Sequence, residues 1–211
     1  MKINFLIRSQ EANSSLLIET VNRLRGEGND VLVFESHENL PTGDFLFILG
    51  YLRIVPGSVL DLHRHNLVIH GSALPKGKGW SPVPWQIAEG THSIPFTLLE
   101  ASEAMDAGDI YFQRDLVLTG TETFQEWKIK QWELTYRMVI EFIESYPDHK
   151  ATPQSGTESF YERRMPEDDQ VDATQTLNEI FDHLRICDPD RFPAWFEVRG
   201  RRFNLRIEPR E

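Results

Sequence analysis

A chain of 211 residues is long enough for one domain with a sizeable core and a small appendage, but two large independent domains would be a tight fit. Hydrophobic residues make up 40% and charged residues 26%, which argues against a largely disordered chain. The formal net charge of -11 repels the phosphate backbone of DNA or tRNA, so we expect no nucleic-acid partner.

The N-terminal half alternates short apolar runs with amphipathic stretches. The first run, Ile3–Ile7, predicts a strand; it turns polar at Arg8 and is too short for a signal peptide or a membrane span. We therefore expect a cytoplasmic protein without a membrane partner. The next elements expected are a helix over Ser14–Arg25, capped by Ser14 or Ser15, and strands over Asp30–Phe34, Phe45–Leu49 and Asn66–His70.

The second part of this pattern begins with a loop. Gly71–Pro84 is dense in Gly, Pro, Ser and Lys, and a short helix through Trp85 and Ile87 is expected after it. Strands over Phe96–Leu99 and Ile110–Phe112 and a long helix over Glu122–Tyr146 complete the series, and we assign the apolar stripe of that helix to core packing. This alternation predicts an α/β fold with a mostly parallel sheet.

Pro147 and the polar residues after it mark a boundary. We predict a main domain over residues 1–147 and a small C-terminal α+β unit over residues 148–211. The unit would hold a helix over Ala173–Arg185 and a hairpin over Trp195–Ile207, and it could support a homodimer. The single cysteine, Cys187, provides neither a disulfide nor a zinc cluster, so we expect a buried apolar group and no metal.

His70 ends a predicted strand, where an open α/β sheet binds its ligands. By itself, a histidine before a glycine-rich loop fits a hydrogen-bonded structural role equally well. A tight turn downstream carries Asp106 and Asp109, and it could bring a carboxylate to the imidazole. The combination favours acid–base chemistry at this strand end.

Three stretches, in this order, resemble the folate-dependent formyltransferase family: Asn66–Pro82, Ile94–Leu98 and Met105–Tyr111. Gly50–Pro56 is similar to the family's segment that lines the pterin pocket. Three segments most resemble the amino-sugar nucleotide N-formyltransferases of the pseudaminic-acid type: His70–Ser72, Leu74–Pro82 and Ser159–Arg164. The resemblance implies a Rossmann-like formyltransferase domain that uses 10-formyl-tetrahydrofolate and no metal.

The family's reaction implies roles for these residues. An amine attacks the formyl carbon, so the tetrahedral oxyanion needs a donor and the ammonium must lose a proton. His70 would stabilise the oxyanion, while Asp106 would orient the imidazole and relay the proton; Asp109 would be a turn-capping carboxylate. The family usually has an asparagine where this chain has Val68, so Ser72, a loop amide or a water would have to supply the missing donor.

The resemblance also implies two groups of ligand contacts. Arg53, Ile54 and Val55 would line the pterin pocket together with Asp106, although Ile54 and Val55 fit a plain core equally well. The cations of the acceptor site could hold a diphosphate or be solvated surface charges, and its tryptophan could stack on a base or a sugar, or pin the loop. The implied acceptor contacts are Ser72, Lys76, Gly77, Lys78, Gly79, Trp80, Arg163 and Arg164.

The implied activity is formyl transfer from 10-formyl-tetrahydrofolate to the amine of a nucleotide-linked amino sugar, with UDP as the expected nucleotide. Methionyl-tRNA is disfavoured by the net charge and by the roughly sixty residues after Pro147. A phosphoribosylglycinamide formyltransferase-like enzyme is the enzymatic alternative and fits the length better, although Arg8–Ser15 lacks the glycines that would wrap a ribose phosphate at a helix N-terminus. The alternative from another class is a folate- or nucleotide-binding module that has lost turnover.

Overall fold

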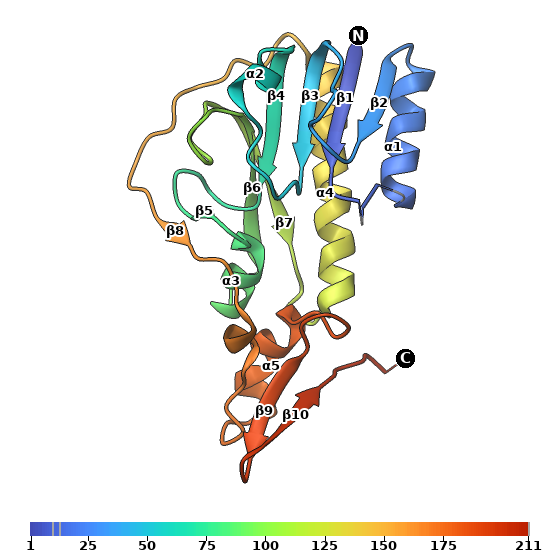
Figure 1. The fold of residues 1–211 in the computed structure, drawn as a ribbon. Coiled ribbons are helices and arrows are strands. Elements are labelled where there is room, and N and C mark those ends of the chain that lie inside the picture. Colours follow the sequence, from blue (N-terminus) through green and yellow to red (C-terminus); the bar gives the residue numbers. More distant parts are fainter. Residues whose placement is uncertain (10, 13, 211) are drawn as a thin grey trace.

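The computed structural model describes residues 1–9, 11–12 and 14–210, and strands and helices alternate along its first half (Figure 1). Up to Pro147 the elements are β1 (Lys2–Ile7), α1 (Ser15–Gly26), β2 (Asp30–Phe34), β3 (Gly43–Leu49), α2 (Gly57–Leu60), β4 (His63–His70), β5 (Lys78–Gly79), α3 (Pro82–Ala88), β6 (Ser93–Glu100), β7 (Ile110–Val117) and α4 (Phe124–Ser145). After Pro147 follow β8 (Phe160–Tyr161), a 3-10 turn (Pro166–Asp169), α5 (Leu177–Ile186), β9 (Ala194–Val198) and β10 (Arg201–Leu205). Every predicted strand and helix is present, while α2, β5 and β8 are additional.

The central sheet has six strands in the order β2-β1-β3-β4-β6-β7. The pairs β1/β2, β1/β3 and β3/β4 are parallel, and the pairs β4/β6 and β6/β7 are antiparallel. The chain leaves β1 for a strand on one side and later returns to its other side, so the strand order reverses at β1 and β3. The prediction of an α/β fold with a mostly parallel sheet is confirmed.

Side-chain caps determine where the helices begin. The Oγ of Ser14 accepts a hydrogen bond from the Leu17 amide at 3.3 Å, as the sequence predicts for α1. α4 and α5 begin two and four residues later than predicted, at Phe124 and Leu177, because Thr123 and Thr176 each form a capping box with the glutamate three residues on. The prediction counted the residues before each cap as helical, so both predicted starts were too early.

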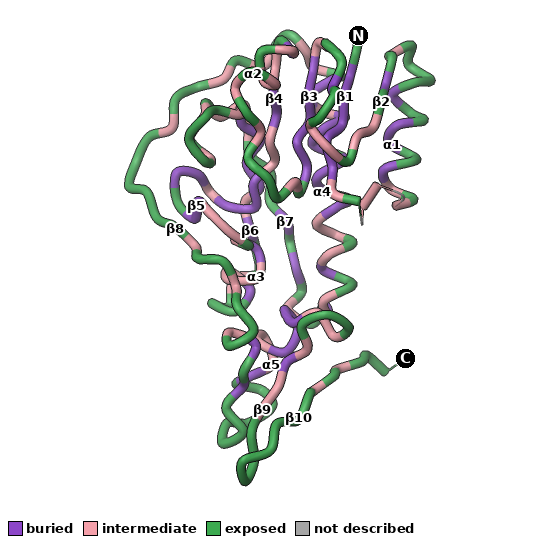
Figure 2. Tube along the Cα trace, in the orientation of Figure 1, coloured by how far each residue is buried: buried purple, intermediate pink, exposed green. Residues whose placement is uncertain are grey.

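Two hydrophobic cores lie on opposite faces of the sheet, whose central strands are buried along most of their length (purple in Figure 2). The larger one lies beneath α1 and α4, where Phe5 and Phe47 of the sheet meet residues such as Phe142 of α4. The smaller one contains Leu46 and Ile48 and is covered by α2 and by loop residues. Because no long helix covers the second face, loops there can surround a ligand.

The C-terminal segment packs on the main domain through α5 (Figure 1). The indole Nε1 of Trp127 donates a hydrogen bond to the backbone carbonyl of Arg185 at 2.9 Å, and Leu184 belongs to the larger core. β9 and β10 pair as the expected antiparallel hairpin, with Arg199 and Gly200 at positive φ in its turn. The division after residue 147 and the homodimer stay predictions.

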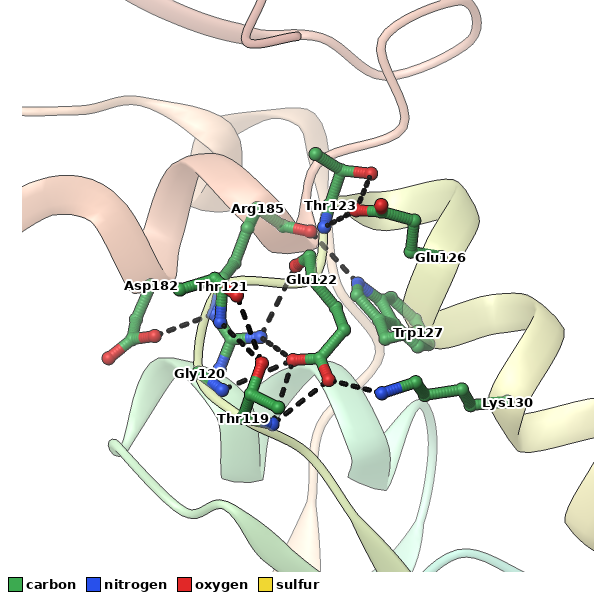
Figure 3. Close-up of polar contacts among 10 residues, drawn as sticks. All are labelled: Thr119, Gly120, Thr121, Glu122, Thr123, Glu126, Trp127, Lys130, Asp182 and Arg185. Atoms are coloured by element: carbon green, nitrogen blue, oxygen red, sulfur yellow. Dashed lines mark hydrogen bonds and ion pairs between the residues drawn. The ribbon is translucent and has the colours of Figure 1, made fainter. Parts of the chain in front are cut away.

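A buried ionic cluster joins α5 to the loop before α4 (Figure 3). The carboxylate of Glu122 accepts hydrogen bonds from the Thr119 amide at 2.9 Å and from the ammonium of Lys130, and its Oε2 lies 3.9 Å from Nη1 of Arg185. Arg185 is fully buried and also pairs with Asp182 at 2.7 Å. Burial alone would raise the pKa of Glu122, but these hydrogen bonds outweigh it and lower that pKa to about 2.

We expect Glu122→Gln to destabilise the protein, because it leaves the buried Arg185 guanidinium without its second carboxylate. The loss should be on the order of 3 kcal/mol in the free energy of unfolding at pH 7, measured with urea. Since the depressed pKa contributes its full stabilisation above the unfolded value near 4.5 and loses it as the pH falls to the folded value near 2, the difference from wild type should shrink over that range. The exposed Glu133→Gln on α4 is the control, and an equal effect there would contradict the role of the cluster.

Candidate active site

The loops that follow three parallel strands surround a cavity of about 1050 Å³. Arg8 follows β1, Gly50–Val55 follow β3, and His70 ends β4, so the cavity lies at the carboxyl ends of the strands where their order reverses. The turn with Asp106, the start of α4 and residues 163–166 complete its wall. Its size is at the upper end of small-molecule sites.

His70 and Asp106 lie side by side in this cavity. Nδ1 of His70 is 3.5 Å from Oδ1 of Asp106, and both side chains are almost fully buried. Nε2 of His70 lies 2.8 Å from the carbonyl oxygen of Gly77; because a carbonyl only accepts, Nε2 carries a proton in this contact. The Nδ1 edge therefore faces the carboxylate, at a distance that a proton transfer or a bound substrate can close.

Two glycines allow the backbone to come close enough for this pair to form. The amide of Gly79 donates to Oδ2 of Asp106 at 2.9 Å, and a Cβ on Gly79 would lie 2.5 Å from the carbonyl oxygen of Tyr161. A Cβ on Gly108 would lie 1.7 Å from the carbonyl oxygen of Glu100, a distance no side chain tolerates. Both positions must be glycine for the turn and the loop to meet as they do.

The predicted pterin-pocket residues line the same cavity. Arg53, Ile54 and Val55 all contribute to its wall. Ile54 is 77% exposed, which excludes the plain-core interpretation for it, whereas Val55 also packs against the smaller core. The guanidinium of Arg53 is mostly exposed and lies 3.6 Å from the carboxylate of Glu38.

The predicted acceptor contacts separate into two groups. Gly79, Trp80, Arg163 and Arg164 line the cavity, and the guanidinium of Arg163 lies over the Trp80 ring at 5.4 Å. Arg164 is largely buried in an ion pair with Asp169, so its charge is already neutralised. Arg163 is exposed and forms its aromatic contact without an ion pair among the described residues.

The remaining predicted acceptor contacts are not part of the cavity wall. Ser72 is 2% exposed and does not line the cavity, so its hydroxyl is not placed to replace the missing asparagine. Lys78 is buried and its ammonium pairs with Glu158, while Gly77 is buried against Ser72 and Tyr161. Lys76 is exposed on the outer side of the loop. These positions argue for structural roles in holding the loop.

Two further predictions concern residues near the pair. Val68 lines the cavity on the same face of β4 as His70 and contributes an apolar surface where the family usually has an asparagine. Asp109 is exposed and lies outside the cavity wall, while its carbonyl accepts a hydrogen bond from the Glu100 amide at 2.9 Å. The geometry therefore distinguishes Asp106 from Asp109 as the carboxylate at the imidazole.

Three cations of the wall were not predicted from the sequence: Arg8, Lys128 and Arg191. The ammonium of Lys128 lies over the rings of Trp127 and Trp132 at 5.4 and 5.9 Å. Burial, reinforced by the charge of Arg8, lowers the pKa of Lys128 to about 8. The sequence did contain a signal for Lys128, because a lysine between two tryptophans interrupts the apolar stripe of this helix. We had assigned that stripe to core packing. Gln10 and Asn13 of the glycine-free first loop lie outside the described residues.

The described residues contain no group of three or more histidine, cysteine or acidic side chains placed to hold a metal. Cys187 is buried beside Asp169, and burial raises the pKa of its thiol to about 12. No helix in the described part of the chain is long and apolar enough to cross a membrane.

Comparison with known proteins agrees with this geometry. The model of the formyl transferase family matches residues 41–143, which include β3, β4, His70 and Asp106. The match spans just under half of the chain, and this segment is similar to the formyl transferase family. The methionyl-tRNA formyltransferase of Acidobacterium capsulatum is 29% identical over 179 residues, which cover 82% of this chain and 57% of that protein. The chain thus spans little more than half the length of this relative.

Solved structures share the fold of the formyl transferase domain. A methionyl-tRNA formyltransferase from Clostridium thermocellum has a TM-score of 0.81 at 19% identity, covering 100% of this chain and 94% of that one. HypX from Aquifex aeolicus, in complex with tetrahydrofolic acid, has a TM-score of 0.73 at 22% identity, covering 98% and 37%. A sugar N-formyltransferase from a Shewanella species has a TM-score of 0.65 at 13% identity, covering 100% and 98%.

We expect Lys128→Met to stabilise the protein at pH 7, because the buried ammonium opposes folding while it is charged. The gain should be on the order of 1–2 kcal/mol in the free energy of unfolding. Since the folded pKa near 8 lies below the ordinary lysine value of 10.5, the gain should be full below pH 8 and shrink as the pH rises towards 10.5. Urea unfolding at several pH values measures it, with the exposed Lys150→Met as control. A gain that does not depend on pH would contradict this interpretation of the cavity wall.

Proposed function

We propose that this protein transfers a formyl group from 10-formyl-tetrahydrofolate to the amine of a nucleotide-linked amino sugar. The observation that carries the proposal is the His70–Asp106 pair, which lies inside a large cavity at the carboxyl ends of parallel strands. The family match of residues 41–143 includes both residues. A fold neighbour holds tetrahydrofolic acid, which supports a reduced pterin as the donor.

The pair supplies what an acyl transfer needs. The amine nitrogen forms a bond to the formyl carbon, the bond from that carbon to the donor nitrogen breaks, and the amine loses a proton. The Asp106 carboxylate is placed to accept that proton and return it to the departing nitrogen. The Nδ1 edge of His70 is the imidazole edge from which a proton could be donated to the oxyanion, because Nε2 is bonded to the carbonyl of Gly77.

The cavity has room and polarity for two ligands. The exposed apolar residues after β3, including Ile54, suit the flat pterin ring at one end. Trp80 with Arg163 forms an aromatic and cationic surface that suits a nucleotide base and its phosphates. UDP is the nucleotide we expect. A small anion can bind such a local surface even though the chain carries a net charge of -11.

Two observations favour other outcomes. The curated relative acts, by its name, on methionyl-tRNA, and this chain matches 57% of its length. Val68 adds no hydrogen-bond donor beside His70, which favours a binding module that has lost turnover. An assay that identifies which acceptor becomes formylated, if any, distinguishes these two functions from transfer to an amino sugar.

We expect the purified protein to form tetrahydrofolate from 10-formyl-tetrahydrofolate only when a UDP-linked 4-amino sugar is present. Parallel reactions would contain methionyl-tRNA, glycinamide ribonucleotide or no acceptor, and mass spectrometry would identify the formylated product. Formylation of methionyl-tRNA or of glycinamide ribonucleotide would replace the proposed acceptor. Folate binding without turnover on any acceptor would support the silent module instead.

Substitution of either member of the pair should abolish measurable transfer. We expect His70→Ala and Asp106→Asn to lower kcat/KM by at least about 100-fold, because each removes a proton-transferring or oxyanion-binding group. Asp109→Asn, in the same turn but outside the cavity wall, is the matched control and should stay near wild type. Thermal unfolding of each variant checks the fold. Retained transfer in a folded His70 or Asp106 variant would refute the assignment.

A further inference from the structure

An extended segment after α4, residues 152–161, contacts both loops that form the His70–Asp106 pair; we call it the strap. Figure 1 shows the chain leaving the top of α4 and descending along the outer side of the molecule into β8. Near the Asp106 turn, Thr152 and Ile110 exchange backbone hydrogen bonds of 2.9 and 2.8 Å. The strap lies outside the part of the chain matched by the family model.

Gln154 of the strap makes the direct contact with the Asp106 turn. Its amide nitrogen donates to the carbonyl oxygens of Asp106 and Gly108, both at 2.8 Å. Because carbonyls only accept, these two contacts fix which end of the amide is the nitrogen. The side chain is half-buried and crosses the turn where its backbone changes direction.

The Asp106 turn needs such support because its backbone is strained. Asp106 has φ of 51°, in the left-handed region that a residue with a Cβ adopts at a cost. In this conformation its carboxylate reaches Nδ1 of His70 on one oxygen and the amide of Gly79 on the other. A turn that relaxed to negative φ would redirect the carboxylate away from the imidazole.

The strap also holds the loop that orients His70. The Oγ of Ser159 accepts a hydrogen bond from the Gly77 amide at 2.9 Å, and the carbonyl of the same glycine accepts from Nε2 of His70 at 2.8 Å. The backbone amides of Lys78 and Trp80 donate to the carbonyls of Ser159 and Tyr161 at 2.9 and 3.0 Å. One segment thus sets the position of both members of the pair.

We infer that Gln154 is a positioning residue for formyl transfer: it holds the Asp106 turn in the left-handed conformation that presents the carboxylate to His70. Its side chain does not itself line the cavity, so it acts through the Asp106 turn. The kinetic part of this inference rests on the proposed function, whereas the conformational part does not.

The test compares Gln154→Met, which keeps the length of the side chain and removes its donors, with Gln154→Lys, which restores a donor. We expect Gln154→Met to lower kcat roughly 10- to 100-fold, because a small displacement of a reacting group has effects of that size. The KM values for 10-formyl-tetrahydrofolate and for the amino sugar should stay close to wild type, since the residues that line the cavity are unchanged. Gln154→Lys should recover part of the lost kcat. Gln175→Met, on an exposed loop before α5, is the control and should leave kcat unchanged.

Hydrogen–deuterium exchange gives a readout that does not need turnover. In Gln154→Met, exchange should become faster in residues 104–109 and at Gly79, whose amide is bonded to Asp106, while the central sheet stays as protected as in wild type. Unchanged exchange in the turn, an unchanged kcat, or faster exchange across the whole sheet would each overturn the inference. If wild type formylates no acceptor, the proposed function fails, and the exchange comparison still decides whether Gln154 holds the turn.

Discussion

The candidate site depends on one contact between distant parts of the chain, the approach of the His70 imidazole to the Asp106 carboxylate. Backbone groups, more than side chains, orient both partners: the carbonyl of Gly77 holds the ring and the amide of Gly79 holds the carboxylate. Both glycines belong to the loop after β4, so the path of that loop sets the whole geometry. This explains why Ser72 and Lys78 are buried under or within the loop and do not face the cavity.

Local patterns were sufficient to predict the sheet and the place of His70. Unbroken apolar runs indicate strands that are covered on both faces, and a parallel sheet brings their carboxyl ends together. The sequence could not reveal which lysines are free, because the answer depends on partners far along the chain. Lys78 pairs with Glu158, eighty positions away, and no local signal records such a pairing. Lys128 was missed because the start of α4 has the apolar stripe of a core helix, although this part of the helix borders the cavity.

The distribution of charge inside the cavity differs from that of the chain as a whole. Arg8, Lys128 and Arg163 all line the wall of a protein whose formal net charge is -11. An extended polyanion interacts with the electrostatic potential of the whole protein surface. A small anion inside a low-dielectric cavity interacts mainly with the nearest charges. Burial lowers the pKa of Lys128 although the carboxylates of Glu11 and Asp188 oppose that shift, and Arg8 already pairs with Glu11 at 2.7 Å. An anionic ligand would add a further counter-charge to this wall.

Val68 places a further requirement on the pair in the proposed reaction. Its side chain has no donor, and Ser72 does not line the cavity, so neither can bind an oxyanion. The ring of His70 cannot turn to present Nε2 without losing its 2.8 Å contact with Gly77, which leaves Nδ1 as the side-chain donor. Nδ1 can donate to an oxyanion when it carries a proton, and Oδ1 of Asp106 lies 3.5 Å from it. Asp106 would therefore orient the donor to the oxyanion as well as serve the amine, which makes the conformation of its turn the feature on which both halves of the chemistry depend.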